Sequence, residues 1–148
     1  MLFDTQTVRA MEQHARDEYP NECCGLVVQR PGGDDLVVRI RNIQDEMHAR
    51  DPSNYPRTAR TAYAGHPADL KAGLELAERD GNSLRAFYHS HPDHDAYFSA
   101  EDIAQATPFG EPSYPESLQV VISIYDGEVR AIKSFVWRPE SATFEAVD

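Results

Sequence analysis

The chain has 148 residues, of which 41% are hydrophobic and 26% are charged, and a formal net charge of −11. This size fits a single globular domain, residues 1–148, that can bury most of its apolar surface. The negative charge argues against the basic surface with which nucleic-acid-binding proteins neutralise phosphates, so we expect no nucleic-acid partner. Neither an apolar run of ~20 residues nor a signal peptide is present, so we expect no membrane partner and a cytoplasmic location.

The acidity of the chain has two explanations. It fits a partner protein with a basic face, or the solvating surface of a protein adapted to high salt. The second explanation agrees with the low number of lysines, since only Lys71 and Lys133 are present. Acidic residues are spread along the whole chain rather than grouped, which favours the surface explanation.

The first part of the chain predicts a helix followed by a β-hairpin. Apolar residues recur every three or four positions between Thr5 and Tyr19, and Pro20 ends this pattern. Two β-branched runs, Cys24–Arg30 and Leu36–Arg41, are separated by a Pro- and Gly-rich turn. Glu22 therefore lies at the start of a strand.

The middle of the chain predicts a long loop, a helix and a strand. Residues 43–57 are polar and proline-containing without a period, which indicates a surface loop that can serve as a flap. A helix is expected over Pro67–Asp80, with Gly81 as its stop. The short apolar and aromatic run Leu84–His89 is typical of a strand.

The last part predicts a short helix, a loop and a second hairpin. The helix begins at Ser99 and ends near Ala106, and residues 107–115 form the loop. The hairpin consists of Leu118–Tyr125, the turn Asp126-Gly127 and Val129–Trp137. Because helices and strands alternate without an internal repeat, we expect an α/β fold, with a mixed β-sheet flanked by helices.

Two histidines and an aspartate have the spacing of metal ligands. His89 and His91 are two residues apart at a strand end, so both imidazoles lie on one face while Ser90 points away. Asp102 follows in the first turn of the helix that Ser99 begins. Two histidines and one carboxylate leave a fourth position open, which is typical of catalytic zinc. The sequence therefore predicts one Zn²⁺ per chain at His89, His91 and Asp102.

These residues resemble the signature of the MPN+ or JAMM zinc metallopeptidases, a glutamate on an early strand followed by H-[ST]-H-P-x6-S-x2-D. The matching segments are Glu22–Leu26, His89–Pro92, Asp93–Phe98 and Ser99–Asp102. The resemblance covers roughly residues 1–135 and is strongest to the short prokaryotic form, similar to the Mec-type sulfur-carrier peptidases. It implies an MPN fold with a cytidine-deaminase-like core, and an enzyme, because inactive members lack the ligands.

The resemblance also implies two catalytic roles. Glu22 matches the glutamate that takes a proton from water and passes it to the leaving amine. Ser99 matches the serine whose hydroxyl donates to the developing oxyanion. The pattern Ser99-x-x-Asp102 is equally that of a helix N-cap, and both roles hold only if the hydroxyl is shared.

Other interpretations of the same residues remain. The series from His89 to His94 also spells H-x-H-x-D-H, the two-metal signature of metallo-β-lactamase-type hydrolases, but no histidine follows His94 to complete such a site. Two histidines and a carboxylate also describe non-haem iron oxygenases. A non-catalytic zinc-binding MPN scaffold in a protein complex is the main alternative. Cys23 and Cys24 are adjacent, which disfavours a structural disulfide, and buried packing suits them better than a role as ligands or nucleophile.

The resemblance offers two substrate classes, lysine-linked ubiquitin conjugates and proteins ending in a cleavable Gly-Gly tail. Linkage-specific members carry inserted segments, whereas this chain has only the loops 43–57 and 107–117 beyond the core. We therefore expect the bond after the Gly-Gly tail of a ubiquitin-like or sulfur-carrier protein to be cut, with the tail bound by β-strand addition beside the site. The oligomeric state cannot be derived from the sequence.

Overall fold

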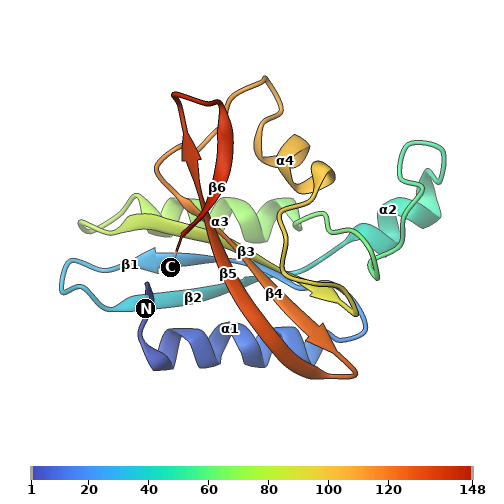
Figure 1. Ribbon diagram of the computed structural model, residues 1–148, viewed down its shortest axis with the longest axis horizontal. Coiled ribbons are helices and arrows are strands. Elements are labelled where there is room, and N and C mark those ends of the chain that lie inside the picture. Colours follow the sequence, from blue (N-terminus) through green and yellow to red (C-terminus); the bar gives the residue numbers. More distant parts are fainter. Residues whose placement is uncertain (1, 148) are drawn as a thin grey trace.

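The computed structural model describes residues 2–147, with four helices and six strands in that range (Figure 1). In chain order they are α1 (Thr5–Glu18), β1 (Cys24–Gln29), β2 (Asp35–Ile40), α2 (Gln44–Arg50), α3 (Pro67–Ala77), β3 (Ser83–Pro92), α4 (Ala100–Ala106), β4 (Leu118–Tyr125), β5 (Glu128–Arg138) and β6 (Thr143–Val147). None of the helices within residues 2–147 combines the length and the apolar character needed to cross a bilayer.

The strands form one mixed sheet in the order β2-β1-β3-β4-β5-β6. The neighbours β3 and β4 are parallel, and every other pair is antiparallel. The connection between the parallel strands contains α4, as a crossover between parallel strands requires. The expected α/β fold with a mixed sheet and flanking helices is therefore confirmed.

Helix α1 covers one face of the sheet, as Figure 1 shows. Its apolar stripe includes Met11 and Ala15, both with no exposed surface. These side chains belong to a buried cluster with Val27 of β1, Tyr88 of β3 and Ile122 of β4. The spacing of Met11 and Ala15 along the helix thus fixes which face of α1 meets the sheet.

Helix α3 lies against the opposite face, over β1, β2 and β3. Leu70 and Leu74 pack against a second buried cluster that includes Leu26 and Ile40. A side-chain carbon added to Gly73 would lie 2.7 Å from Leu26 Cδ1, so this glycine permits the close approach of helix and sheet. The face beneath α3 also carries the side chains that form the candidate site.

The loop expected over residues 43–57 is wrong in its first half, because Gln44–Arg50 form helix α2. This helix has acidic residues in its first turn and basic residues in its last turn, an arrangement that favours the helix dipole. It has no apolar stripe, so the sequence offered no helical period to recognise. Buried Gln44 donates to the Arg57 carbonyl at 2.9 Å, so α2 is tied to the irregular segment that follows it. Whether the segment moves as a flap stays a prediction.

Three further features differ from expectation by more than one residue. The strand β6 was not predicted, and it pairs with β5 in part through an edge-on contact between Trp137 and Phe144. Helix α3 ends at Ala77 rather than Asp80, since the Asn82 side chain donates to the Leu76 carbonyl and closes the helix early. Strand β3 continues three residues past His89, through Pro92.

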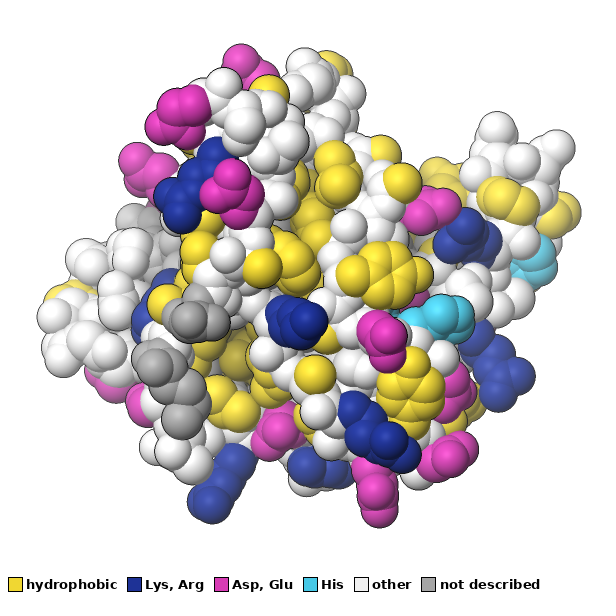
Figure 2. Space-filling view, in the orientation of Figure 1, with side chains coloured by type: hydrophobic (Ala, Val, Ile, Leu, Met, Phe, Trp, Pro, Cys, Tyr) yellow, Lys and Arg dark blue, Asp and Glu magenta, His cyan; other side chains and the backbone are white. Residues whose placement is uncertain are grey.

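On the face shown in Figure 2, acidic and basic side chains are interspersed among apolar ones, with no block of one charge.

The buried imidazole of His14 predicts a stability that depends on pH. Its Nδ1 lies 2.6 Å from the Tyr88 hydroxyl, and burial, helped by Arg39, lowers the pKa of His14 from 6.5 to about 4. Between these two pH values His14 binds a proton in the unfolded chain but not in the folded chain. The contribution of neutral His14 to the free energy of unfolding is therefore fully present above pH 6.5 and is lost as the pH falls towards 4. One group with this shift accounts for about 2–3 kcal/mol.

The measurement is urea unfolding of the wild type and of His14→Gln between pH 7 and pH 4. We expect the free energy of unfolding of the wild type to fall more steeply, so that the difference between the two proteins narrows with acidification. Parallel curves for the two proteins would contradict the prediction, because other titrating groups are common to both.

Candidate metal centre

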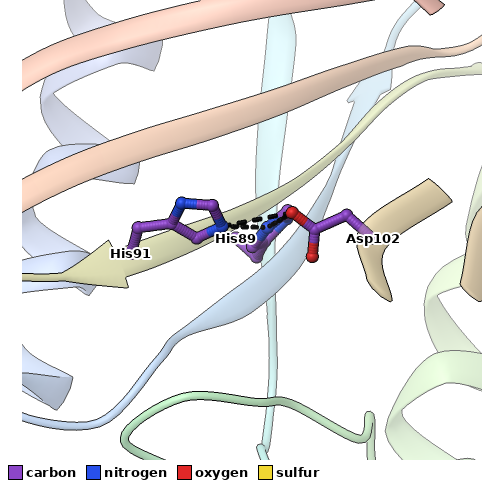
Figure 3. Close-up of side chains that lie close together, drawn as sticks. All are labelled: His89, His91 and Asp102. Carbon is purple, nitrogen blue, oxygen red and sulfur yellow. Dashed lines mark hydrogen bonds and ion pairs between the residues drawn. The ribbon is translucent and has the colours of Figure 1, made fainter. Parts of the chain in front are cut away.

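Three predicted ligands converge on the face of the sheet beneath α3 (Figure 3). His89 and His91 project from β3 on the same side, with their Nε2 atoms 3.1 Å apart. Each Nε2 atom lies 3.1 Å from Oδ2 of Asp102, which projects from α4. All three residues are buried, and they are the only converging group of potential metal ligands within residues 2–147.

The position of Asp102 follows from the way α4 begins. The Ser99 hydroxyl accepts a hydrogen bond from the Asp102 amide at 3.1 Å, and the Ser99 amide donates to Asp102 Oδ2 at 3.0 Å. This reciprocal capping box satisfies two backbone donors at the helix end. It also holds the carboxylate oxygen that faces the two histidines. The predicted N-cap role of Ser99 is therefore confirmed.

The protonation of His91 shows that the three atoms suit a cation. Its Nδ1 lies 2.9 Å from the Asp95 carbonyl oxygen, which can only accept, so Nδ1 carries the hydrogen. In the neutral ring Nε2 then presents a lone pair towards Asp102 Oδ2, which presents lone pairs of its own. A positive ion between these atoms would satisfy both. The donor set therefore fits a metal ion, and the bond to Asp95 has the form usual for metal-ligating histidine.

The pKa shifts of His89 and Asp102 are compatible with the binding of a metal ion. Burial lowers the pKa of His89, which favours the neutral imidazole that a metal requires. Burial opposes ionisation of Asp102, but the side chain of His89 and the Ser99 amide hold its pKa well below the usual range. The ring of Tyr63 stacks on His89, with centroids 4.8 Å apart. The surroundings thus favour a neutral imidazole at His89 and an ionised carboxylate at Asp102.

Ser90 lies between the two histidines and points to the other face of the sheet, as the alternation of a strand requires. Its hydroxyl accepts the Cys23 amide at 2.8 Å, and its own amide donates to the Cys23 carbonyl at 3.1 Å. These bonds fix the strand of the ligands against the chain segment that contains Glu22.

Glu22 is buried and lines the same cleft as His91 and Asp102. Its backbone is held at both ends, because its amide donates to Ala59 at 2.7 Å and its carbonyl accepts from Asn42 at 2.9 Å. No group in residues 2–147 hydrogen-bonds to its carboxylate. Burial, and then the charge of Asp102, raise the pKa of Glu22 to about 9, while Arg57 opposes the shift.

The cleft has further walls that the sequence did not reveal. Its empty volume is about 630 Å³, and its lining includes Arg57, Tyr63, Tyr97 and Gln105 in addition to the predicted residues. Arg57 and Tyr63 come from the irregular segment between α2 and α3, and no motif or period singles them out. Only the path of the chain brings them to the site.

The alternative metal ligands are not assembled. His94 Nδ1 lies 2.8 Å from the Pro92 carbonyl, and Asp93 accepts from the Tyr19 hydroxyl, so neither belongs to the converging group. Cys23 and Cys24 are free and buried, and burial raises the pKa of each thiol to about 12, which is unfavourable for a ligand or nucleophile. A two-metal or cysteine site is therefore not formed by the described residues.

Comparisons with known proteins agree with this geometry. Residues 4–137 match the family model described as prokaryotic homologs of the JAB domain. A segment of 46 residues is 48% identical to a protein of Thermus thermophilus named as a probable TtuB-protein conjugate cleaving protease, and it spans 31% of either chain. The match thus covers about a third of that relative.

Solved structures resemble the whole fold. A protein from Salinibacter ruber has a TM-score of 0.65 at 27% identity and is matched over 100% of this chain and 89% of its own. A protein from Desulfitobacterium hafniense has a TM-score of 0.69 at 22% identity, over 99% of this chain and 88% of its own. A JAB1/MPN domain protein from Archaeoglobus fulgidus has a TM-score of 0.53 at 14% identity, over 95% of this chain and 89% of its own. The latter two likenesses concern the fold alone.

Proposed function

The chain belongs to the prokaryotic homologs of the JAB domain, and from this we propose that it is a zinc-dependent peptidase that cleaves after the Gly-Gly tail of a ubiquitin-like or sulfur-carrier protein. One observation carries the proposal. Two histidines and a carboxylate converge in a cleft that also holds an unengaged glutamate, Glu22.

His89, His91 and Asp102 would hold the ion, since two imidazoles and one carboxylate are the ligands of many catalytic zinc sites. A bound zinc ion supplies Lewis acidity, which makes water more acidic and polarises the carbonyl group of the substrate. The buried walls around the ligands limit the access of bulk water, so charges in the cleft interact strongly.

Glu22 moves the proton in the proposed reaction. It takes a proton from the attacking water and gives it to the nitrogen that leaves when the carbon–nitrogen bond breaks. Burial and Asp102 raise the pKa of Glu22, and the positive charge of an ion held by the three ligands would lower it again, so the group could both accept and return a proton. Its anchored backbone keeps the side chain in place while it does so. The Glu22 side chain lines the same cleft as His91 and Asp102.

Ser99 can serve as both cap and donor. The cap uses a lone pair of the hydroxyl oxygen, which accepts from the Asp102 amide. The hydroxyl hydrogen remains available for an oxyanion that develops on the substrate, and the side chain lines the cleft. The two roles that the sequence set against each other are therefore compatible.

The substrate assignment is supported by the relative that is named for cleaving TtuB-protein conjugates, which suggests a protein carrier as substrate. The tail would bind by β-strand addition beside the site rather than to β3 itself. Strand β3 is paired on both sides, by β1 and β4, so a tail cannot add to the strand of the ligands. The irregular segment over residues 57–63, which lines the cleft, could supply the main-chain contacts to the tail.

Mass spectrometry tests this function. We expect the zinc-loaded protein to convert a small carrier ending in Gly-Gly-Ala into one ending in Gly-Gly, and Glu22→Gln to leave it intact. A lysine-linked conjugate cut in preference would exclude the Gly-Gly-tail assignment. Zinc-loaded protein that cuts neither substrate would indicate the non-catalytic scaffold.

A further inference from the structure

Arg57 stands at the rim of the cleft, opposite α4. Its Nη2 lies 2.8 Å from Glu101 Oε1, and its Nη1 lies 3.4 Å from the Thr61 carbonyl. It is the only lysine or arginine that lines the cleft. Since its own carbonyl is held by buried Gln44, the guanidinium extends from an anchored backbone.

Arg57 shares the cleft with Glu22. The proposed reaction passes a proton through Glu22 to the leaving nitrogen, so that nitrogen must come close to Glu22. Glu22 and Arg57 line one cleft, and the charge of Arg57 lowers the pKa of Glu22 against burial and Asp102. An acidic group beside the leaving nitrogen would therefore enter the cleft that contains this guanidinium.

The charges of the cleft make this cation necessary for an acidic substrate. Glu22, Glu101 and Asp102 all line the cleft, so an incoming carboxylate meets three acidic residues. A planar guanidinium binds a carboxylate through two parallel hydrogen bonds. Its present partner is replaceable, because the Arg57 and Glu101 side chains are 48% and 60% exposed and exposed ion pairs are weak.

We propose that Arg57 is a specificity-determining residue, which binds the α-carboxylate of a single C-terminal residue that follows the Gly-Gly tail. The inference rests on the proposed function and specifies its substrate. In such a residue one carbon separates the amine from the carboxylate, whereas a lysine side chain carries no carboxylate beside its amine. When no substrate is bound, the guanidinium of Arg57 forms an ion pair with Glu101.

The reaction is a hydrolysis that needs no further reactant. The oxygen of water bonds to the carbonyl carbon of the second glycine, and the bond to the following nitrogen breaks. One water proton passes through Glu22 to that nitrogen, and the second is released when the new carboxyl group ionises. The products are a carrier ending in a Gly-Gly carboxylate and a free amino acid, whose own carboxylate Arg57 has held throughout.

The test compares two carriers that end in Gly-Gly-Ala, one with a free carboxylate and one with a carboxamide. For zinc-loaded wild type we expect kcat/KM to be about 10–100-fold higher for the acid, the range of one charge-assisted interaction. This preference should fall to near unity in Arg57→Gln and be partly kept in Arg57→Lys. Glu101→Gln should increase it, because a competitor and a repelling charge are removed.

Arg60→Gln is the matched control. It removes the same charge from an exposed residue of the same segment that does not line the cleft. We expect it to keep the preference of the wild type. Loss of the preference in Arg60→Gln as well as in Arg57→Gln would mean that only net charge matters and would overturn the proposal.

Two further outcomes separate this inference from the proposed function. Equal cleavage of acid and amide by the wild type would overturn the role of Arg57 and leave the peptidase standing. If neither is cut, the function fails, and calorimetry of both peptides with zinc-loaded Glu22→Gln decides the inference. Tighter binding of the acid that disappears when Arg57→Gln is added would support it, and equal affinities would overturn it.

Discussion

Replacing Glu22 by glutamine is expected to lower kcat/KM of the zinc-loaded protein by about 10²–10⁴-fold, the range typical of general acid–base catalysis. Glutamine has nearly the same shape as glutamate, but its amide cannot take the proton of the attacking water. The backbone bonds of Glu22 to Ala59 and Asn42 do not involve the side chain, so the segment should keep its place. Initial rates of carrier cleavage give the effect.

Two measurements isolate the chemical role of Glu22. Zinc content and the midpoint of urea unfolding should match those of the wild type, because neither the ligands nor a hydrogen bond of the fold is removed. Glu46→Gln is the control for charge, since Glu46 is exposed on α2 and does not line the cleft of the ligands. If Glu22→Gln cleaves the carrier at the rate of Glu46→Gln, Glu22 has no part in proton transfer.

The loss of a single ligand is expected to abolish tight zinc binding. The wild type should retain about one zinc per chain after dialysis, and His91→Ala should retain close to none, because two ligands leave the ion underbound. Asp102→Asn should also lose zinc while it preserves α4, since the amide oxygen can still accept the Ser99 N–H. Elemental analysis of the dialysed proteins provides the measurement.

His94→Ala is the control for the ligand set. It removes a neighbouring histidine that does not belong to the converging group, so zinc should stay near one per chain. Loss of zinc in His94→Ala together with its retention in His91→Ala would exclude the proposed ligands and revive the two-metal alternative.

The candidate site was predictable because its geometry is local. The alternation of a strand puts His89 and His91 on one face, and the capping pattern puts Asp102 in the first turn of α4. Both rules act within a few residues, so they are visible in the sequence. The tertiary step that joins strand and helix came from the resemblance to a family signature rather than from any local rule.

Other features depend on contacts between distant segments and left no local signal. Helix α2 is polar on all sides and is held by bonds to Arg57 and Ala59. Strand β6 forms because its backbone pairs with β5 at the edge of the sheet. The position of β3 in the middle of the sheet, which closes it to an added strand, follows from the pairing order alone. Arg57 reaches the cleft for the same reason, through the path of an irregular segment.

Two hydrogen bonds join Ser90 to Cys23, the neighbour of Glu22, so the distance between Glu22 and the two histidines depends on the register of the two chain segments. Cys24 stands opposite His89, and a slip of one residue between β1 and β3 would turn both histidines to the face covered by α1. The distance between Glu22 and the histidines therefore does not change gradually when surrounding residues are substituted, because β1 and β3 are either in register or out of register. Residues 107–117, in the loop after α4, make no hydrogen bond to Glu22, Cys23 or Ser90, so they can change while the spacing between Glu22 and the histidines is kept.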